Sequence, residues 1–356
     1  MALTPAEITH YQRHLTLPGF GLEAQEKLKA SSVLVIGAGG LGCPVLMYLA
    51  AAGIGKIGIV DFDIISQSNL HRQVLYSTED VGRSKATVAV EKLRAQNPHI
   101  QLVAYQEQLN AQNALSLLKE YDIVVDGSDN FSTRYLVNDA CVISNKPLVS
   151  GSLFTFQGQV SVFNYQGGPT YRCLFPEPPP EEEMPNCAEI GVLGVLPGVI
   201  GTLMATEVIK MATGIGEVVS GKLLLYDALA MRFQTLEFEG KEENKQISQL
   251  GQYDFSCVTK HPNQEITSEE VKEWKRRGTP FQLIDVREPY EFEAFNIEGE
   301  NMPLSELEDH VLHISKTRKV VIHCQVGSRS RKAIQHLESK YGFSNLLNLK
   351  NGLKDW

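Results

Sequence analysis

A run of glycines near the N-terminus could bind phosphate groups. Gly37, Gly39 and Gly42 follow an apolar, β-branched segment at residues 33–36 in the spacing G-x-G-x-x-G, and an apolar helix-like segment comes next. This spacing lets backbone N–H groups approach a polyphosphate, and the N-terminus of the following helix adds a favourable field. Asp61 ends the next strand-like segment, where a carboxylate can accept hydrogen bonds from ribose hydroxyls. The stretch predicts a nucleotide site but does not name the nucleotide.

Charged residues after the glycine turn exceed what a dinucleotide needs. Arg72 and Lys85 follow Asp61, and Asp129 follows a buried strand-like run at residues 122–126. Two cations near the turn suit a triphosphate that leaves as pyrophosphate, because its charge must be neutralised in the transition state. Asp129 would emerge at the same sheet edge, where a carboxylate can hold Mg²⁺. Each residue alone is compatible with an ordinary charged surface, but together they favour adenylyl transfer over hydride transfer.

A second reactive loop is predicted near the C-terminus, where the segment HCQVGSR joins a strand-like to a helix-like segment. Successive backbone N–H groups in such a turn form an anion-binding nest, and Arg329 adds a cation. Cys324 in this nest is expected to be a nucleophile. Cysteine phosphatases use the spacing C-x5-R, whereas C-x4-R is one residue shorter and suits a single sulfur atom better. The alternative is a buried cysteine beside an ordinary glycine turn.

Cys187 ends a loop rich in proline and glutamate, residues 167–186, and precedes another apolar helix-like segment. Near an acyl adenylate, this thiol could capture the acyl group as a thioester, or attack a persulfide to release a thiocarboxylate. From the residues alone, a small side chain packed at a helix start explains the position equally well.

The segments around these residues alternate between strand and helix patterns, which predicts an α/β fold. The expected architecture is a Rossmann-like doubly wound nucleotide-binding domain, with a mostly parallel sheet covered on both faces, and a smaller α/β domain. Residues 241–264 are polar and irregular, as in a linker. A capping box, Thr267-x-x-Glu270, opens the second domain. The predicted division is 1–240, linker 241–264 and 265–356.

Composition excludes several classes of protein. The net charge of −9 argues against a nucleic-acid-binding surface. The N-terminus lacks the basic and apolar regions of a secretory signal, and the longest apolar stretch, 191–205, is too short and too interrupted to span a membrane. The six cysteines lack the spacing of a disulfide framework. We therefore expect a cytoplasmic protein that contacts no membrane and does not bind nucleic acid directly.

Residues 8–238 resemble the MoeB/ThiF family, relatives of the ubiquitin-activating enzymes. The shared segments are RHL, VLVIGAGGLG, VDFD, SNLHRQ, GRSKA, DGSDNFSTRY and CAEIGVLGVLPGVIG, in that order. The resemblance implies adenylation, with ATP and Mg²⁺, of the C-terminal Gly-Gly of a ubiquitin-like carrier. The positions that match the family's ATP site are Gly40, Asp61, Ser68, Asn69, Leu70, His71, Arg72, Lys85, Asp129 and Asn130.

Three further positions gain a role from this resemblance. Asp129 matches the Mg²⁺-linked acid that adenylation needs, and Cys187 matches a reactive cysteine. Arg13 matches an arginine that is donated across a homodimer interface, so the resemblance implies a homodimer.

The chain departs from the family at a structural zinc site, which is usually held by two C-x-x-C pairs. The first pair reads Thr170-x-x-Cys173, and the candidate for the second reads Asp254-x-x-Cys257. Two thiolates do not fill a tetrahedral zinc site, and threonine and aspartate are weak substitutes. We predict that the structural zinc is absent.

Residues 265–356 resemble a rhodanese domain through the segment IDVREPYEF and the loop at Cys324. Rhodaneses hold a persulfide on the matching cysteine, and Arg329 is expected to stabilise its terminal sulfur anion. An adenylating domain fused to a persulfide carrier places two halves of one reaction on one chain.

The predicted product is a thiocarboxylate on a MoaD- or ThiS-like sulfur carrier, with sulfur from a persulfide donor such as a cysteine desulfurase. Molybdopterin synthesis, thiamine synthesis and tRNA thiolation stay open as pathways. One alternative is an NAD-dependent oxidoreductase with a regulatory rhodanese domain, which Arg72, Lys85 and Asp129 disfavour. A non-catalytic carrier-binding scaffold is the other, and the intact catalytic positions disfavour it.

Overall fold

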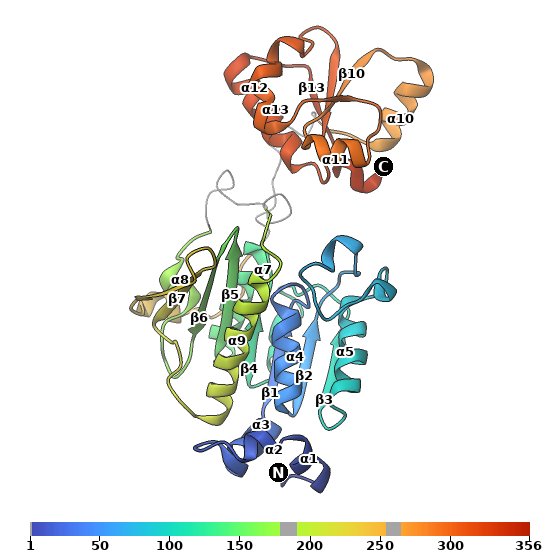
Figure 1. The fold of residues 1–356 in the computed structure, drawn as a ribbon. Helices are drawn as coiled ribbons and strands as arrows, with labels where there is room; N and C mark the ends of the chain where they lie inside the picture. The colour runs from blue at the N-terminus through green and yellow to red at the C-terminus, as the bar shows by residue number, and fades with distance from the viewer. Residues whose placement is uncertain (1, 179–190, 254–264) are drawn as a thin grey trace. The chain divides into compact units, whose positions relative to one another are not determined.

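The computed structural model describes residues 2–178, 191–253 and 265–356 (Figure 1). The chain divides into two compact units, Met1–Phe255 and Ser256–Trp356. In the described ranges, every helix is too short or too polar to span a bilayer.

The first unit is built on an eight-stranded sheet in the order β3-β2-β1-β4-β5-β6-β7-β8. Its parallel strands are β1 (Ser32–Ile36), β2 (Lys56–Val60), β3 (Gln101–Tyr105), β4 (Ile123–Asp126) and β5 (Leu148–Phe154). The antiparallel strands that follow are β6 (Gln157–Phe163), β7 (Lys222–Asp227) and β8 (Arg232–Glu237). Strands β2 and β3 lie on one side of β1, and β4 and β5 lie on the other. The winding therefore reverses between β1 and β4, and ligands bind at the carboxyl ends of strands at such a switch point.

Helices cover both faces of this sheet (Figure 1). Val33 and Val35 of β1 pack in one core cluster with residues of α4, α5 and α9, whereas Leu34 and Ile36 pack in another with residues of α6 and α7. Successive strand residues point to opposite faces, so a strand that is apolar at every position has to be buried on both sides. The helices are α1 (Pro5–His10), α2 (Gln12–Leu15), α3 (Gly21–Ala30), α4 (Gly42–Ala52), α5 (Lys85–Gln96), α6 (Ala114–Leu118), α7 (Phe131–Ile143), α8 (Tyr171–Leu174) and α9 (Leu196–Thr213).

Residues 241–253, the first part of the predicted linker, pack on the first unit. Residues Glu242–Lys245 form a short 3₁₀ helix, and Asn244 Nδ2 donates to the carbonyl oxygen of Arg172 (3.0 Å). The Tyr253 hydroxyl donates to Asp139 Oδ2 (2.7 Å). The rest of the predicted linker, 254–264, lies outside the described residues, and the domain boundaries stay a prediction.

The second unit holds a five-stranded parallel sheet in the order β11-β10-β12-β13-β9. Its strands are β9 (Glu265–Ile266), β10 (Phe281–Asp285), β11 (Glu300–Asn301), β12 (Lys319–His323) and β13 (Leu346–Leu349). Its helices are α10 (Ser268–Arg277), α11 (Pro289–Ala294), α12 (Leu307–His310) and α13 (Ser328–Tyr341). The capping box is present: Thr267 Oγ1 accepts from the Glu270 N–H, and Glu270 Oε2 accepts from the Thr267 N–H. The two units together have the predicted α/β fold class.

Candidate functional site

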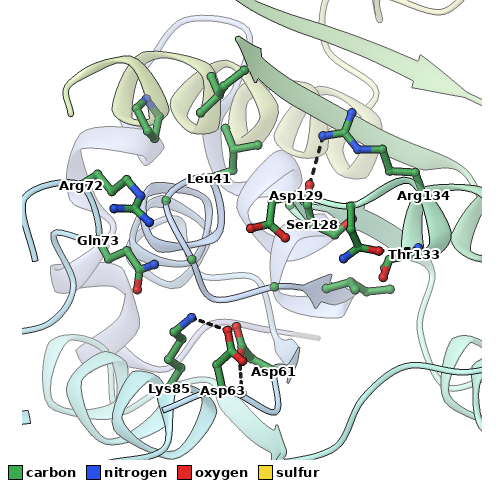
Figure 2. A pocket seen from close by; sticks show the side chains of 18 of the residues that line it. Leu41, Asp61, Asp63, Arg72, Gln73, Lys85, Ser128, Asp129, Thr133 and Arg134 are labelled. Atoms are coloured by element: carbon green, nitrogen blue, oxygen red, sulfur yellow. Dashed lines mark hydrogen bonds and ion pairs between the residues drawn. The ribbon is translucent and has the colours of Figure 1, made fainter. Parts of the chain in front are cut away.

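The first unit has a cavity of about 280 Å³ at the carboxyl ends of β1, β2 and β4 (Figure 2). This is the switch point of the sheet, where a nucleotide site was predicted. The predicted residues that line the cavity are Gly40, Asp61, Arg72, Lys85, Asp129 and Asn130. They come from segments far apart in the sequence, and the parallel topology gathers them at one edge.

The glycine turn leaves no room for side chains at its closest contacts. Gly37 has a φ of 90°, in the left-handed region that favours glycine. A Cβ at Gly42 would lie 1.9 Å from the carbonyl oxygen of Gly37, so only glycine fits there. Helix α4 begins at Gly42, and its N-terminal N–H groups therefore face the cavity side of the turn.

Asp61 supports the glycine turn from the end of β2. Its Oδ2 accepts from the Ala38 N–H (2.8 Å), and its Oδ1 accepts from the Asp63 N–H (2.8 Å). Burial raises the pKa of Asp61, while Lys85 and the two backbone N–H groups oppose that rise. A carboxylate oxygen can accept a second hydrogen bond, so the predicted contact with a ribose hydroxyl is compatible with this arrangement.

Lys85 reaches the cavity from the first turn of α5. Its Nζ donates to Asp63 Oδ2 (2.8 Å), and its side chain is 7% exposed whereas that of Asp63 is 52% exposed (Figure 2). Sequence reasoning missed Asp63, which holds this cation in place. A triphosphate that entered here would meet a lysine already oriented by a carboxylate.

Within the segment SNLHRQ, Arg72 is the predicted residue that lines the cavity. Its Nη1 donates to the carbonyl oxygen of Ser68 (3.1 Å), so the arginine side chain bonds the backbone four residues earlier in the same segment. In the described ranges, the lining of the cavity does not include Ser68, Asn69, Leu70 or His71. Asn69 Oδ1 accepts from the Ser66 N–H, and the His71 ring bonds the carbonyl oxygen of Ser68. These contacts shape the turn, and their roles at ATP stay predictions.

Asp129 and Asn130 follow β4 and line the cavity. Figure 2 shows Asp129 across the cavity from Arg72 and Lys85. Asn130 is the N-cap of α7, and its side chain accepts from the Thr133 N–H (2.8 Å). A second helix N-terminus therefore faces the cavity. Mg²⁺ is commonly held by one or two carboxylates together with phosphate oxygens and water, so a single exposed Asp129 carboxylate fits that ion.

Sequence reasoning missed two further lining residues, Gln73 and Arg134. Gln73 is 4% exposed, and its Oε1 has no hydrogen-bond partner among the described residues. Arg134 Nη2 donates to the carbonyl oxygen of Ser128 (3.2 Å) from the second turn of α7. One signal in the sequence could have found Arg134. Asparagine is a common N-cap residue, so Asn130 marks a helix start, and Arg134 lies one helical turn after it.

Arg13 lies away from the cavity of its own chain. It is exposed on α2, which precedes α3, and the end of α3 lies beside the start of β2, where the Lys56 N–H donates to the carbonyl oxygen of Ser31. The N-terminal helices are therefore at the amino ends of the strands, opposite the glycine turn (Figure 1). The fold does not bring Arg13 to the other predicted ATP-site residues within one chain.

The second unit places Cys324 directly after β12, in the loop that leads to α13. Cys324 is fully buried, and its Sγ accepts from the Gly327 N–H (3.1 Å). Gly327 has a φ of 88°, which turns its N–H toward the sulfur. This contact agrees with the predicted nest of backbone N–H groups.

Arg329 makes a bidentate ion pair with Glu291 of α11. Nη1 donates to Oε2 (2.6 Å) and Nη2 to Oε1 (2.8 Å), and this hydrogen bonding lowers the pKa of Glu291. The Arg329 guanidinium, which was predicted to stabilise a sulfur anion, is thus already paired with a carboxylate. The role of Arg329 at a persulfide stays a prediction.

Buried polar groups lie behind the loop. Arg287 makes an ion pair with Asp285 (2.7 Å), and its Nη1 donates to Gln325 Oε1 (3.3 Å). His323 is fully buried beside Asp285, and burial lowers the pKa of this imidazole to about 4. The imidazole next to Cys324 is therefore neutral near pH 7.

The residues at the position of the family's first zinc-binding pair, Thr170 and Cys173, do not fit a zinc site. Thr170 Oγ1 lies 3.4 Å from Cys173 Sγ, and the sulfur also accepts from the backbone N–H of Lys241 (3.2 Å). Although burial raises the pKa of Cys173, the hydrogen bonds from Thr170 and Lys241 lower it overall. Asp254, Cys257 and Cys187 lie outside the described residues. The four described cysteines, 43, 141, 173 and 324, are buried and unpaired.

Comparisons with known proteins match both units. The ThiF family profile matches residues 11–248, and the rhodanese-like domain profile matches residues 267–356. The probable adenylyltransferase/sulfurtransferase MoeZ of Mycobacterium tuberculosis is 43% identical over 369 residues, which cover 100% of this chain and 94% of the relative. The adenylyltransferase and sulfurtransferase MOCS3-1 of Zea mays is 41% identical over 384 residues, covering 99% of this chain and 82% of the relative. A crystal structure of E. coli MccB with ATP has a TM-score of 0.56 and 25% identity, covering 66% of this chain and 70% of that one.

Proposed function

This chain belongs to the ThiF family and carries a rhodanese-like domain, and we propose that it makes a C-terminal thiocarboxylate on a ubiquitin-like sulfur carrier. Relatives that match nearly its whole length are named adenylyltransferase and sulfurtransferase, and this chain is an enzyme of both classes that uses ATP. The alternative of an NAD-dependent oxidoreductase finds no support among them.

One observation carries the adenylation half of the proposal: a single cavity at the switch point of the sheet. The glycine turn, Arg72, Lys85 and Asp129 all line it. Two helix N-termini and two cations favour a polyphosphate, while the carboxylate fits the metal ion that accompanies ATP. A hydride-transfer site has no need of that combination.

Adenylation joins the carrier's terminal carboxylate to AMP. A carboxylate oxygen attacks the α-phosphorus, the bond to the bridging oxygen breaks, and pyrophosphate leaves with the electron pair. Arg72 and Lys85 would neutralise the charge that develops on the leaving group. Asp129 would hold Mg²⁺, which supplies further positive charge to the phosphates when it is bound.

Sulfur transfer starts at Cys324. Its thiolate attacks the terminal sulfur of a donor persulfide, such as that of a cysteine desulfurase, and the donor leaves as a thiolate. The resulting Cys324 persulfide attacks the acyl carbon of the adenylated carrier and displaces AMP, which gives an acyl disulfide. The Cys187 thiolate then attacks Cys324 Sγ, releases the thiocarboxylate and leaves a disulfide between Cys187 and Cys324. An external dithiol reductant would restore both thiols.

We also propose a homodimer, because Arg13 is exposed and its helix, α2, lies at the end of the sheet opposite the cavity of its own chain. An arginine with a role at ATP would then have to come from a second copy. The carrier would end in Gly-Gly, as the resemblance to the MoeB/ThiF family implies. Molybdopterin synthesis, thiamine synthesis and tRNA thiolation stay equal candidates for the pathway.

The test is the intact mass of a Gly-Gly-ended carrier after incubation with the enzyme, ATP, Mg²⁺ and a persulfide donor. We expect the carrier to gain one sulfur atom in place of one oxygen atom. With Cys324→Ala, the carrier should stay unmodified in mass after hydrolysis of its adenylate. Carrier-dependent ATP–pyrophosphate exchange should continue in that variant, because Cys324 belongs to the second unit.

The control is Cys141→Ala, which removes a buried thiol of the first unit from the C-terminal half of α7; burial raises the pKa of this thiol. Its thiocarboxylate yield should match that of the unchanged protein. A carrier that gains sulfur with Cys324→Ala would refute Cys324 as the obligatory donor. Absence of pyrophosphate exchange with every Gly-Gly-ended carrier would refute the adenylation half.

A further inference from the structure

Two buried polar side chains beside Cys324 have no role in the sulfur chemistry described above. Ser330 lies in the first turn of α13 and Asn348 lies on β13, and they are 0% and 2% exposed. Ser330 Oγ lies 2.6 Å from Asn348 Oδ1 and 3.5 Å from Cys324 Sγ. A serine hydroxyl has one proton, so it donates to one of these two atoms at a time.

The side-chain NH₂ group of Asn348 makes no hydrogen bond among the described residues. Its nitrogen, Nδ2, is buried. An unsatisfied buried donor costs free energy, and no hydrogen bond at Nδ2 opposes rotation of the amide. A half-turn about χ2 exchanges Oδ1 and Nδ2, and Nδ2 then donates to Ser330 Oγ.

The two amide orientations suit two forms of the cysteine. With the neutral thiol, the Ser330 hydroxyl donates its proton to Asn348 Oδ1 at 2.6 Å, the shorter of its two contacts, and Cys324 Sγ, at 3.5 Å, is the weaker acceptor. After Cys324 loses its proton to water, the sulfur can only accept. Asn348 Nδ2 then donates to Ser330 Oγ, and the hydroxyl proton turns to Cys324 Sγ, adding a second donor to the Gly327 N–H.

We propose that Ser330 and Asn348 are positioning residues that stabilise Cys324 as the thiolate, an inference that rests on the proposed sulfur transfer. A hydrogen bond to a charged group contributes more than one between neutral groups, particularly where water is excluded. The pair would supply the donor without placing a permanent charge beside the buried sulfur.

Other charged and titratable groups surround the loop. Asp285 and Arg287 come from β10 and the loop after it, His323 precedes the cysteine on β12, and Glu291 of α11 pairs with Arg329 of α13. All of these are unchanged in the variants below. A difference between a variant and the unchanged protein therefore reports the Ser330–Asn348 pair.

The experiment measures the alkylation rate of Cys324 by iodoacetamide against pH, in the full chain, on the peptide that contains Cys324. Ser330→Ala should raise the pH midpoint of alkylation by about one unit, the size expected for one lost hydrogen bond to an anion. Ser330→Thr keeps the hydroxyl and should keep the midpoint. Ser339→Ala makes the same chemical change on an exposed part of α13 and should have no effect.

Asn348→Asp gives a second test, because a carboxylate of nearly the same shape accepts from Ser330 but cannot donate to it, and its negative charge adds to the rise in the midpoint. The midpoint should rise at least as far as in Ser330→Ala. Either variant, folded by its tryptophan fluorescence and with an unchanged midpoint, would overturn the proposal. If Ser330→Ala does not fold, Ser330→Gly, which also removes the hydroxyl, takes its place, because a rise in Asn348→Asp can also come from the charge of the new carboxylate.

The alkylation midpoint needs no sulfur donor, so it separates this inference from the proposed function. Sulfur loading of Cys324 from a persulfide donor, read as the added mass of one sulfur atom, tests the function itself. A shifted midpoint without loading in the unchanged protein would support the pair and refute sulfur transfer. Normal sulfur loading of the unchanged protein, with a midpoint that does not shift in the variants, would support sulfur transfer and refute the role of the pair.

Discussion

The nucleotide cavity and the cysteine loop differ in how they expose their reactive groups. In the first unit, Asp129 is exposed and Arg72 half-buried, and the cavity is lined by side chains from at least five separate segments. In the second unit, Cys324 is 0% exposed and lies in one short loop, held by the backbone of Gly327. The cavity gathers charged side chains from many elements, whereas the reactive sulfur lies in one short turn, whose backbone N–H at Gly327 contacts it directly.

This difference separates the two sites in their response to substitution. A charge at the rim of a cavity contributes little to folding, so its removal should affect activity alone. A group buried in the loop is also part of the core of the second unit, since Cys324 packs in the cluster with Ile322 and Ala333. Changes there should alter stability and reactivity together.

The largest expected effect is that of Asp129→Ala. Carrier-dependent ATP–pyrophosphate exchange should fall by at least about 100-fold, as when one electrostatic contact to a transition state is lost. The free energy of unfolding should change by less than about 0.5 kcal/mol, because the carboxylate is exposed. Exchange assays and urea unfolding measure the two effects.

Glu120→Ala is the matched control, since it removes a 56%-exposed carboxylate paired with Lys56 and does not line the cavity. Its exchange activity should be unchanged. Full exchange activity in Asp129→Ala with Mg²⁺ present would rule out the metal assignment. A large decrease in the free energy of unfolding of Asp129→Ala would show that this carboxylate also stabilises the fold.

A second prediction asks whether the cavity is complete within one chain. Arg13→Ala should lower exchange by about tenfold or more, although Arg13 is exposed far from the cavity of its own chain. Heterodimers of Arg13→Ala with Asp129→Ala, purified by two different tags, contain one site with both residues intact. They should recover about half of the unchanged activity.

Each homodimeric variant serves as the control for this mixture. Heterodimers as inactive as both homodimers would mean that Arg13 acts within its own subunit or through the fold. Full activity of Arg13→Ala alone would remove the arginine from the site.

The predicted residues that line the cavity are those whose positions follow from local patterns. A glycine turn after one strand and Asp129 after another reach the same edge in any parallel sheet of this topology. Asp61 and Lys85 also follow from position along the chain. The interactions between side chains did not follow, since the partner of Lys85 is Asp63, and nothing local distinguishes it from other surface carboxylates.

The cysteine loop was predictable in outline but not in its electrostatics. The motif located Cys324 and the turn at Gly327, which depend on backbone geometry. The pairing of Arg329 with Glu291 joins residues 38 positions apart on two helices, and a pattern within the loop cannot contain it. Strand β13, which carries Asn348, was also missed, so the neighbours of the sulfur could not be predicted.

A third prediction concerns acid stability, which should differ between the two units. The pKa of His323 is about 4 in the folded protein against an ordinary value of 6.5, because burial disfavours the imidazolium. Between these values the unfolded chain binds the proton and the folded chain does not, so stability falls as pH falls from 6.5 to 4. The loss should reach about 3 kcal/mol.

The first unit should respond at lower pH. Glu7 and Asp80 have pKa values of about 2, held down by hydrogen bonds from Lys29 and Lys92 against the effect of burial, so their contributions are lost only as pH falls through the range below about 4. Urea unfolding followed by tryptophan fluorescence reports the second unit, because Trp274 and Trp356 both belong to it. His323→Leu should abolish most of the loss between pH 6.5 and 4.5, and an equal loss in that variant would refute this assignment.

The smallest expected effect is that of a chelator, which should leave the thermal unfolding midpoint of the first unit unchanged. A tetrahedral zinc needs four ligands, and a threonine stands at the first position of the Thr170-x-x-Cys173 pair. The Cys173 sulfur instead accepts from the Lys241 N–H, and Thr170 Oγ1 donates to the carbonyl oxygen of Asn244 (3.3 Å). These bonds tie residues 241–244 to α8, the anchoring that a zinc ion would otherwise provide.

Cys173→Ser should therefore lower the free energy of unfolding of the first unit by about 1 kcal/mol, with or without chelator, because the serine hydroxyl keeps some of these bonds. Metal analysis that finds one tightly held zinc per chain, or a chelator that lowers the midpoint, would contradict this account and make the cysteines outside the described residues the first candidates for ligands.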